Sequence, residues 1–501
     1  MRTRGTRRRK PVSRLAVLAC LIGLSACLAP DASAQDVYAV GVITSEYSYH
    51  TEAEASLFDN RVELDIETGP VRLGFVHRFY EPSGEDYPGA LDIPGSEFRQ
   101  RFAEFTKDSF RIRAGDFFAT FGRGLSLRSY EEVELEHDTS LDGVFVQVDR
   151  GAFSIEGLSG TIDEEVTSSR TREHLVRGVR LGTNLGGRVD VGMSAVGRSS
   201  ELVDENVELP DEIAHHEDRV LGLETSAWLG PVTLGAEYVG RSGENPFADG
   251  DELEGHGAYL SAAVDLEWAT LFGEFKDYEE LGHHLVNPPT CVREHLWTLM
   301  NRATYEIDLD DERGFLGEIS APLGDALYVT GGASEARTQG GDLSHWEMFA
   351  HVDHALASKL TGSFAASWSR EYLGNEYNDF TEHLSGAAEL VVEPASGVPI
   401  ELVVEGQRTE EFYGVVHKDY LFSVTTYPGD GTTFSVLAET TDDETVERDF
   451  WTSFEVRREI VEDVEMSFTM GTERGGKKCT GGICYVEPEF EGFRVRLTGY
   501  F

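Results

Sequence analysis

The sequence lacks several features that mark common classes of protein. After the first 30 residues, no apolar run approaches the roughly 18 residues that a transmembrane helix needs. Lysine and arginine are scarce, with 43 residues against 90 aspartates and glutamates. The resulting formal charge of −47 argues against a nucleic-acid binder, because a polyanion repels phosphate. Five cysteines in 501 residues exclude a disulfide mini-domain, and a hydrophobic content of 40% excludes a disordered chain.

The first 34 residues have the layout of a secretory signal peptide. Residues 1–14 are rich in arginine, residues 15–29 are apolar, and the small residues Ala32-Ser33-Ala34 offer a cleavage site. We therefore expect a mature chain of residues 35–501. Leu24-Ser25-Ala26-Cys27 resembles a bacterial lipoprotein cleavage box, which would instead leave a lipidated Cys27. Cleavage after Ala34 is favoured because an integral barrel needs no lipid anchor.

From residue 36 onward, apolar and polar residues alternate with period two in segments of about 10 residues. In residues 232–238, for example, every second residue is apolar, while Glu237 lies on the other face. Such even alternation over the whole mature chain favours one closed transmembrane barrel over a soluble sandwich. The apolar face would contact lipid and the polar face a wet lumen, so we expect no apolar core.

The connections between these segments alternate between short turns and long loops. Short turns are expected at 68–70, 107–109, 149–151, 185–187, 229–231, 323–325 and 428–431. Long loops are expected at 81–95, 121–142, 200–217, 243–254 and 280–313. This asymmetry is typical of a Gram-negative outer-membrane barrel with short periplasmic turns and long extracellular loops. The sequence therefore predicts an all-β, antiparallel barrel of about 24 strands, surrounded by outer-membrane lipid and lipopolysaccharide.

The last strand alternates from Phe493 and ends in Phe501. This pattern resembles the C-terminal signal by which bacterial outer-membrane barrels are recognised for assembly. We therefore expect Phe501 to contact the barrel-assembly machinery.

A barrel of about 24 strands is wide, so we expect long loops to narrow it. Strand alternation begins almost directly after Gln35, which predicts no N-terminal plug domain. Gly122 and Gly124 permit a sharp backbone turn, and loop 121–142 is expected to fold inward and set opposed charges across the opening. The alternative is a solvated outer loop. Candidate constriction residues are Arg111, Arg113, Arg123, Arg128, Glu131, Glu132, Glu134, Glu136 and Asp138.

Loop 280–313 is a second candidate to cap or plug the bore, with a short helix expected within residues 292–301. Histidines 283, 284 and 295 lie near Cys291, but their spacing fits no standard zinc site, so no metal is predicted. Cys291 is expected to be an unpaired loop thiol. Cys479 and Cys484 flank a tight turn in an exported protein, which predicts a disulfide between them.

Two stretches, Gly115–Leu127 and Asn287–Glu318, resemble an uncharacterised family of bacterial outer-membrane barrels with a porin-like layout. In that family a Gly-Asp…Gly-Arg-Gly-Leu segment precedes an Asn-Pro-Pro…Arg-Glu-His segment. The resemblance implies the barrel fold and carries no activity.

The predicted function is an outer-membrane channel, passive or gated, for small hydrophilic solutes. The alternative is a surface-structural or binding barrel, or the outer-membrane component of an export assembly. Acidic loops at Glu201–Asp218 and Asp442–Asp449 motivate that alternative, because they are candidates to hold divalent cations; simple solvation is the other interpretation. Histidine and aspartate lie close together in sequence at 215–218 and 351–354, but such proximity is expected by chance in a chain this acidic. We therefore predict no enzyme and no cofactor.

Overall fold

The structure is a computed structural model that describes residues 37–84, 87–88, 95–167, 170–204, 215–244, 252–281, 285–302, 311–341, 343–372, 374, 380–394, 397–480 and 483–501. The predicted signal peptide, its cleavage site and Cys27 lie outside these residues. Among the described residues, no helix is both long and apolar enough to span a membrane.

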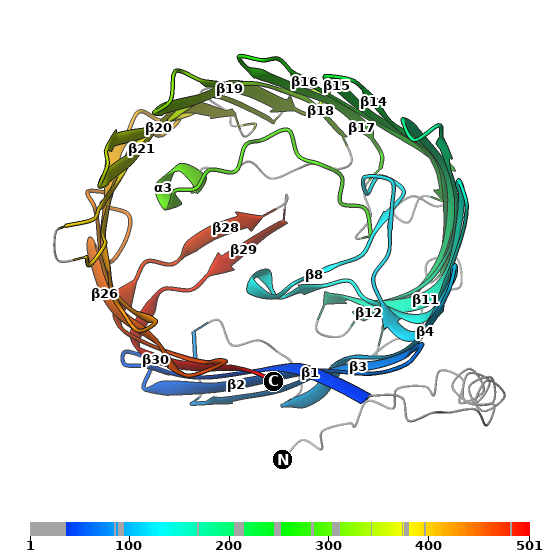
Figure 1. The fold of residues 1–501 in the computed structure, drawn as a ribbon, viewed down its shortest axis with the longest axis horizontal. Helices are drawn as coiled ribbons and strands as arrows, with labels where there is room; N and C mark the ends of the chain where they lie inside the picture. Colours follow the sequence, from blue (N-terminus) through cyan, green and yellow to red (C-terminus); the bar gives the residue numbers. More distant parts are fainter. Residues whose placement is uncertain are drawn as a thin grey trace.

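Twenty-four strands form a single antiparallel sheet that closes into a ring (Figure 1). In chain order they are β1 (Val37–His50), β2 (Ala55–Thr68), β3 (Val71–Ser83), β4 (Ser96–Lys107), β5 (Phe110–Phe117), β10 (Leu141–Arg150), β11 (Phe153–Thr167), β12 (Arg170–Leu185), β13 (Val189–Asp204), β14 (His215–Leu229), β15 (Val232–Glu244), β16 (Glu252–Asp265), β17 (Thr270–Glu279), β18 (Asp311–Pro322), β19 (Leu327–Arg337), β20 (Ser344–Ala357), β21 (Leu360–Tyr372), β22 (Thr381–Val392), β23 (Ile400–Glu410), β24 (Val416–Gly429), β25 (Thr432–Thr441), β26 (Phe450–Val461), β27 (Val464–Glu473) and β30 (Phe490–Tyr500).

Each barrel strand pairs with the next barrel strand along the chain, and β1 pairs with β30 to close the ring. At the closure Val42 lies opposite Tyr500, and the backbones of Gly41 and Phe501 exchange hydrogen bonds of 2.8 and 3.1 Å. Closure satisfies the backbone groups that would otherwise be left unpaired at a sheet edge in lipid. The predicted antiparallel barrel and its number of strands are confirmed.

The predicted alternation of apolar and polar faces is also confirmed. On β15, Leu234 and Tyr238 are 40% and 56% exposed on the outer face, whereas Glu237 between them is 3% exposed on the inner face. Outer-membrane barrels show this arrangement because lipid-facing and lumen-facing residues alternate along each strand.

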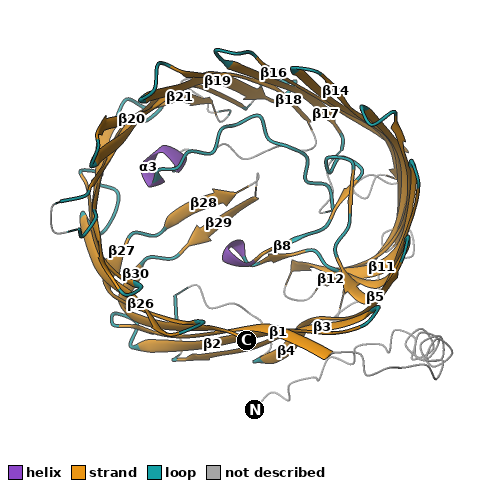
Figure 2. Ribbon diagram, in the orientation of Figure 1, coloured by secondary structure: helices purple, strands orange, loops and turns teal. Residues whose placement is uncertain are grey.

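Three segments enter the barrel between strands (Figure 2). The first insert, residues 118–140, contains β6 (Thr120–Phe121), β7 (Leu127–Arg128), β8 (Glu131–Glu132), the 3-10 helix η1 (Val133–Leu135) and β9 (His137–Asp138). The second insert, residues 280–302 apart from 282–284, ends in the short helix α3 (Thr298–Asn301). The third insert, residues 474–489, contains the hairpin of β28 (Gly476–Thr480) and β29 (Ile483–Glu487).

The expectation that the barrel needs no apolar core is wrong. A buried apolar cluster inside the barrel joins the first two inserts to the wall. The first insert contributes Phe121, Leu125 and Leu127; the second contributes Leu281, Leu285 and Val286; the wall contributes Val176, Val196, Val220, Val239 and others. The inserts carry apolar residues of their own, and these must be buried. The neighbouring strands β12–β15 therefore each turn one valine inward against the inserts. Val196 of β13, for example, lies directly opposite Val220 of β14.

Candidate functional site

The first insert turns sharply where its tip meets the wall. Gly122 and Gly124 have φ angles of 64° and 101°, a region that favours glycine, as the sequence predicts. The Gly124 N–H donates to the Phe121 carbonyl at 3.2 Å. On the wall, Glu237 accepts the backbone N–H of Arg123 at 2.5 Å. The tip is therefore held by both the turn itself and a carboxylate of β15.

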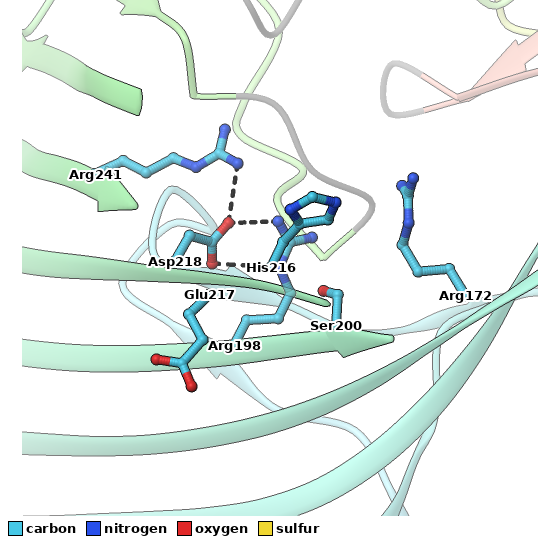
Figure 3. A pocket seen from close by; sticks show the side chains of 7 residues that line it. All are labelled: Arg172, Arg198, Ser200, His216, Glu217, Asp218 and Arg241. Carbon is cyan, nitrogen blue, oxygen red and sulfur yellow. Dashed lines mark hydrogen bonds and ion pairs between the residues drawn. The ribbon is translucent and has the colours of Figure 1, made fainter. Parts of the chain in front are cut away.

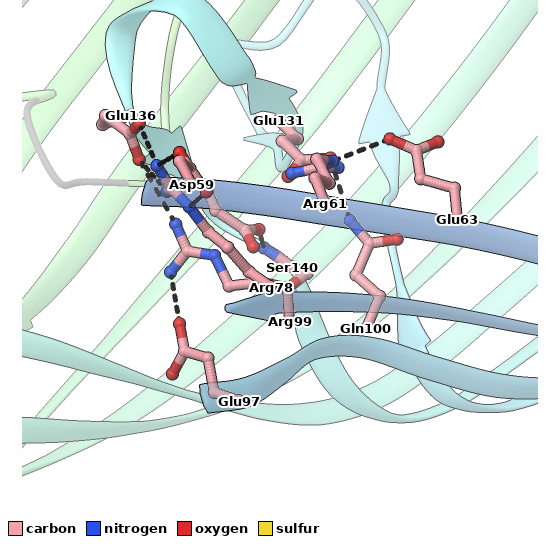
Figure 4. Close-up of polar contacts among 11 residues, drawn as sticks. Asp59, Arg61, Glu63, Arg78, Glu97, Arg99, Gln100, Glu131, Glu136 and Ser140 are labelled. Atoms are coloured by element: carbon pink, nitrogen blue, oxygen red, sulfur yellow. Dashed lines mark hydrogen bonds and ion pairs between the residues drawn. The ribbon is translucent and has the colours of Figure 1, made fainter. Parts of the chain in front are cut away.

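Charged side chains of the wall hold the outer part of the first insert (Figure 4). Arg61 of β2 donates from Nη1 and Nη2 to the two carboxylate oxygens of Glu131, both at 2.9 Å. Gln100 of β4 donates to the same carboxylate at 3.1 Å. Two parallel donors from one guanidinium fix the direction of the carboxylate as well as its position.

A second pair repeats this arrangement one strand further along. Arg78 of β3 donates to both oxygens of Glu136, at 2.6 and 2.9 Å, and also to Asp59 of β2. Arg99 of β4 lies 3.6 Å from Glu136. The Arg78 side chain is 8% exposed, so these contacts are shielded from water and are only weakly screened by salt.

The first two inserts are bonded to each other. The Arg128 N–H donates to the Leu285 carbonyl at 2.8 Å, and the Arg128 Nη1 donates to the Asn287 carbonyl at 3.2 Å. The Asn287 side-chain amide in turn donates to the Tyr130 hydroxyl. Together with their shared apolar cluster, these bonds make the two inserts one packed unit against strands β10–β17.

The wall of β23 binds the short helix at the end of the second insert. Glu405 accepts the N–H groups of Thr298 and Leu299 at 3.3 and 2.8 Å. Gln407 donates to the Leu299 carbonyl at 2.7 Å. Glu405 thus accepts from backbone N–H groups at the start of α3, and Gln407 on the same face of β23 donates to a backbone carbonyl of the helix.

A carboxylate on β25 links the second and third inserts. Arg302, just after α3, donates to both oxygens of Glu439, at 2.5 and 2.8 Å. Arg474, at the start of the third insert, donates to Glu439 at 3.0 Å and to Asp419 at 2.5 Å. Glu439 is only 3% exposed. Within the lumen, Cα atoms of β29 lie within 8 Å of Cα atoms of η1, so the third insert also reaches the first.

Cys291 of the second insert is a buried free thiol packed against Leu316 and Phe349. Burial disfavours the thiolate and raises the pKa of Cys291 to about 12. The prediction of an unpaired loop thiol is confirmed. Cys479 and Cys484 lie opposite each other in the backbone register of β28 and β29. Their side chains lie outside the described residues, so their predicted disulfide stays a prediction.

The predicted constriction residues fall into three groups. Glu131 and Glu136 bind wall arginines, as described above. Arg123 and Arg128 lie over aromatic rings, with their guanidinium carbons 5.4 and 4.7 Å from the ring centroids of Tyr259 and Tyr130. Arg111 and Arg113 both bind Glu104 of β4, at 2.9 and 2.7 Å. Arg111 and Arg113 therefore pair with a carboxylate of the wall, and not with the first insert.

The remaining candidates belong to the β8–β9 pair. Glu132 lies opposite His137 in the backbone register. Asp138 accepts the Ser140 N–H at 2.9 Å, and burial raises the pKa of Asp138. The side chain of Glu134 lies outside the described residues. Sequence reasoning missed Arg61, Arg78 and Gln100, although arginine at alternate inward positions of neighbouring strands was an available signal.

The predicted cation-binding loops are described only in part. Residues 205–214 of the first loop lie outside the described residues, as do His283 and His284 of the second insert. Asp443 of the other acidic loop accepts the Thr445 N–H at 2.9 Å, so that carboxylate caps its own turn. In the described part of the chain, no group of three or more histidine, cysteine, aspartate or glutamate side chains is placed to hold a metal ion.

The closed wall, its apolar outer face and its polar lumen define an outer-membrane β-barrel, and this fold implies an outer-membrane location. The chain belongs to a family of unknown function, DUF6029, whose model matches residues 42–324, more than half of the chain. No curated protein matches the chain.

Solved outer-membrane barrels have a similar fold. The E. coli P pilus tip assembly intermediate PapC-PapD-PapK-PapG is 11% identical, with a TM-score of 0.52 over 94% of this chain, which spans 62% of that chain. The PapC translocation pore is 10% identical, with a TM-score of 0.48 over 93% of this chain and 99% of that one. A BenF-like porin from Pseudomonas fluorescens Pf-5 is 13% identical, with a TM-score of 0.40 over 71% and 97%. At these identities the likeness concerns the fold alone.

Proposed function

We propose that this barrel is an outer-membrane channel for small hydrophilic solutes, narrowed by its three inserts. The observation that carries the proposal is that each insert is bonded to the inner wall. Arg78 holds the first insert, Glu405 the second, and Glu439 both the second and the third. A wide barrel with fixed internal segments admits solutes by size and polarity instead of passing everything.

The wall that faces the lumen supports passage of polar solutes. Toward the turn end of β22–β26, inward positions carry carboxylates and hydroxyls, among them Glu389, Glu401, Thr425, Ser435 and Glu455. Such groups replace part of a solute's hydration shell as it passes. The first insert is the proposed constriction, because ion pairs between its Glu131 and Glu136 and arginines of the wall hold it inside the lumen.

Conductance tests the proposal directly. Purified protein in a planar bilayer is expected to give stepwise current increments, and a barrel that inserts without any steps contradicts it. Deletion of residues 123–138 removes most of the first insert and is expected to raise the step size. An unchanged step would show that this insert does not form the constriction.

The export alternative is distinguished by a different measurement. The pilus intermediate with the similar fold contains other protein chains. At 11% identity, that likeness makes an assembly role for this barrel an alternative to test and gives it no further support. Recovery of a stoichiometric partner from the native membrane, together with an absence of current steps, would favour this alternative over the channel.

A further inference from the structure

Arg177 of β12 and Arg219 of β14 both lie on the outer, lipid-facing side of the barrel wall. Both are exposed, and their strand neighbours Val176 and Val220 are buried in the apolar cluster inside the barrel. Because successive residues of a strand point to opposite faces, both guanidinium groups leave the wall on the lipid side. Such a position needs a physical reason, because an outward arginine is destabilising near the middle of a bilayer and nearly neutral only at its interfaces.

The strand register places these arginines in one row across the wall, which we call the arginine row. Arg177 lies opposite Gly197 of β13, and Gly197 lies opposite Arg219. Neighbouring strands are about 4.7–4.9 Å apart, so the Cα atoms of the two arginines are about 10 Å apart. A Cβ atom on Gly197 would meet nothing within 4 Å, which leaves open space between the arginines. Hydroxyl groups complete the row, with Ser159 of β11 opposite Arg177 and Ser242 of β15 opposite Arg219.

The arginine row lies at the boundary between the apolar and the polar part of the outer face. Toward the short turns, the next two outward positions of β12, β13 and β14 are apolar, and Val179 and Leu221 among them are 43% and 64% exposed. Toward the long loops, the outward positions become acidic at Glu173 and Glu201. Because the long loops of such barrels are extracellular, this boundary lies in the outer leaflet, at the level of its headgroups.

The two arginines of this row lack partners in the described part of the chain, where neither side chain makes a hydrogen bond or an ion pair. This includes Glu217, which shares the outer face of β14 with Arg219. The inner face next to the row is different, because Arg198 and Arg241 both donate to Asp218, at 3.3 and 2.9 Å (Figure 3). The wall therefore neutralises its arginines on the inside here and leaves those on the outside uncompensated.

Several outward arginines elsewhere on the wall are paired with acids of the chain. Arg313 of β18 donates to Asp277 of β17 at 2.6 Å, and Arg408 of β23 donates to Glu410 at 2.7 Å. An exposed guanidinium on this lipid-facing surface can thus be neutralised from within the protein. In the arginine row that role is left to an anion from outside the chain.

We propose that the arginine row binds a phosphate group of lipopolysaccharide in the outer leaflet, over Gly197 and between Arg177 and Arg219. A planar guanidinium matches two oxygens of a phosphate, and a charged acceptor makes the strongest hydrogen bonds with it. The exposed apolar positions toward the short turns contact the acyl chains of the same lipid, so the charge and the apolar surface fit one amphiphile. The site lies outside the lumen and is independent of whether the barrel conducts.

Native mass spectrometry of the detergent-solubilised full chain tests the proposal, with bisphosphorylated lipid A as the probe and dephosphorylated lipid A as its matched control. We expect saturable binding of the bisphosphorylated form and at least about tenfold weaker binding of the dephosphorylated form. The double variant with Arg177→Gln and Arg219→Gln should lose a similar factor for the bisphosphorylated form. The corresponding double lysine variant keeps the charges without the planar forks and should lie between the two.

The control variant is Arg408→Gln, which removes an outward arginine that is already paired within its own strand and should bind lipid A as the wild type does. If the double glutamine variant does not fold, the single variant Arg177→Gln carries the same comparison.

Three results would overturn the proposal. One is the absence of saturable binding of bisphosphorylated lipid A to the wild-type protein. Another is equal binding by the glutamine variant and the wild type. The third is equal affinity of the wild type for phosphatidylglycerol, which would show that the row accepts any anionic lipid. Current steps in a bilayer are measured separately, so failure of the channel proposal would leave this result interpretable.

Discussion

Arg78 of β3 donates from both terminal nitrogens of its guanidinium to the two carboxylate oxygens of Glu136, at 2.6 and 2.9 Å. The two residues are 58 positions apart in sequence, and one belongs to the barrel wall while the other belongs to the first insert. The bond thus ties the first insert to the barrel wall, beside the contacts that Arg61 and Gln100 make with Glu131.

Glu136→Gln is expected to loosen the first insert. The substitution keeps the shape of the side chain but removes the charge, and hydrogen bonds to a charged group contribute about 1.5–3 kcal/mol each. Single-channel recording should show larger or more frequent current steps than in the wild type. Asp65→Asn is the matched control, because Asp65 of β2 accepts two hydrogen bonds from Arg72 of β3, at 3.1 and 2.6 Å, and this pair lies within the wall. Equal traces from the two variants would show that the Arg78–Glu136 pair does not hold the insert.

Gly257→Val is expected to push both apolar inserts away from the wall. A Cβ atom on Gly257 would lie 2.6 Å from Cδ2 of Leu281 and 3.2 Å from Cδ2 of Leu125, one residue from each insert. Overpacking of this kind costs about 1–3 kcal/mol. Trypsin should then cleave faster after Arg123 and Arg128, which lie in the first insert.

The control for this substitution is Gly240→Val on the neighbouring strand, where a Cβ atom meets nothing within 4 Å. Gly240 lies next to Val239 and so points to the opposite, outer face. Unchanged cleavage in Gly257→Val, at the rate seen for Gly240→Val, would contradict the close packing of inserts and wall.

The barrel was predictable because lipid imposes a repeating pattern. Every strand must place apolar residues outward, so Leu234 and Tyr238 on β15 reveal their strand without knowledge of its neighbours. The inward turn of the first insert was also signalled locally, by Gly122 and Gly124. Strand alternation and a glycine turn are both set by the residues of one segment, so the sequence of that segment is enough to predict them.

The contacts that fix the inserts could not be predicted in the same way. The partners of Glu131 and Glu439 are 70 and 137 residues distant, and no spacing rule connects them. The inward apolar row, in which Val196 meets Val220, departs from the polar lumen that alternation favours. It exists only because another part of the chain packs there. Such features arise from tertiary contacts between segments, which a single sequence does not display.

Cys291 provides a reporter for the position of the second insert. Burial raises the pKa of its thiol to about 12, so between pH 7 and 9 almost no thiolate forms, whereas an ordinary thiol with a pKa of about 8.5 becomes reactive over this range. Alkylation by iodoacetamide should therefore be slow in the native protein throughout this range, although its rate still rises with pH as the small thiolate fraction grows. In denaturant the thiol is exposed and has its ordinary pKa, so the rate should be far higher at each pH. Fast alkylation of native protein, followed by mass spectrometry of the Cys291 peptide, would contradict burial of this segment.

Cys479 and Cys484 are expected to form a disulfide, because the backbone places them directly opposite each other in β28 and β29. The loop between them is short, so the bond should affect the hairpin locally and change global stability little. Alkylation before and after reduction should label neither cysteine at first and both afterwards. Labelling of both cysteines without reductant would show that the bond is absent, and Cys291, blocked by burial, serves as the internal control.

Glu439 is expected to be the residue whose loss affects the lumen most. It accepts from Arg302 of the second insert and from Arg474 of the third, so Glu439→Gln weakens two inserts at once. With about 1.5–3 kcal/mol for each charged hydrogen bond, the second insert should loosen about as much as the first insert does in Glu136→Gln. The third insert should loosen less, because Arg474 keeps its bond to Asp419. Conductance should rise and alkylation of Cys291 should accelerate. Glu410→Gln on β23 is the control, since Glu410 accepts from Arg408 of its own strand at 2.7 Å and lies on the face opposite to the inward Glu405 and Gln407. If Glu439→Gln matches this control in both measurements, these two arginines do not anchor the inserts through Glu439.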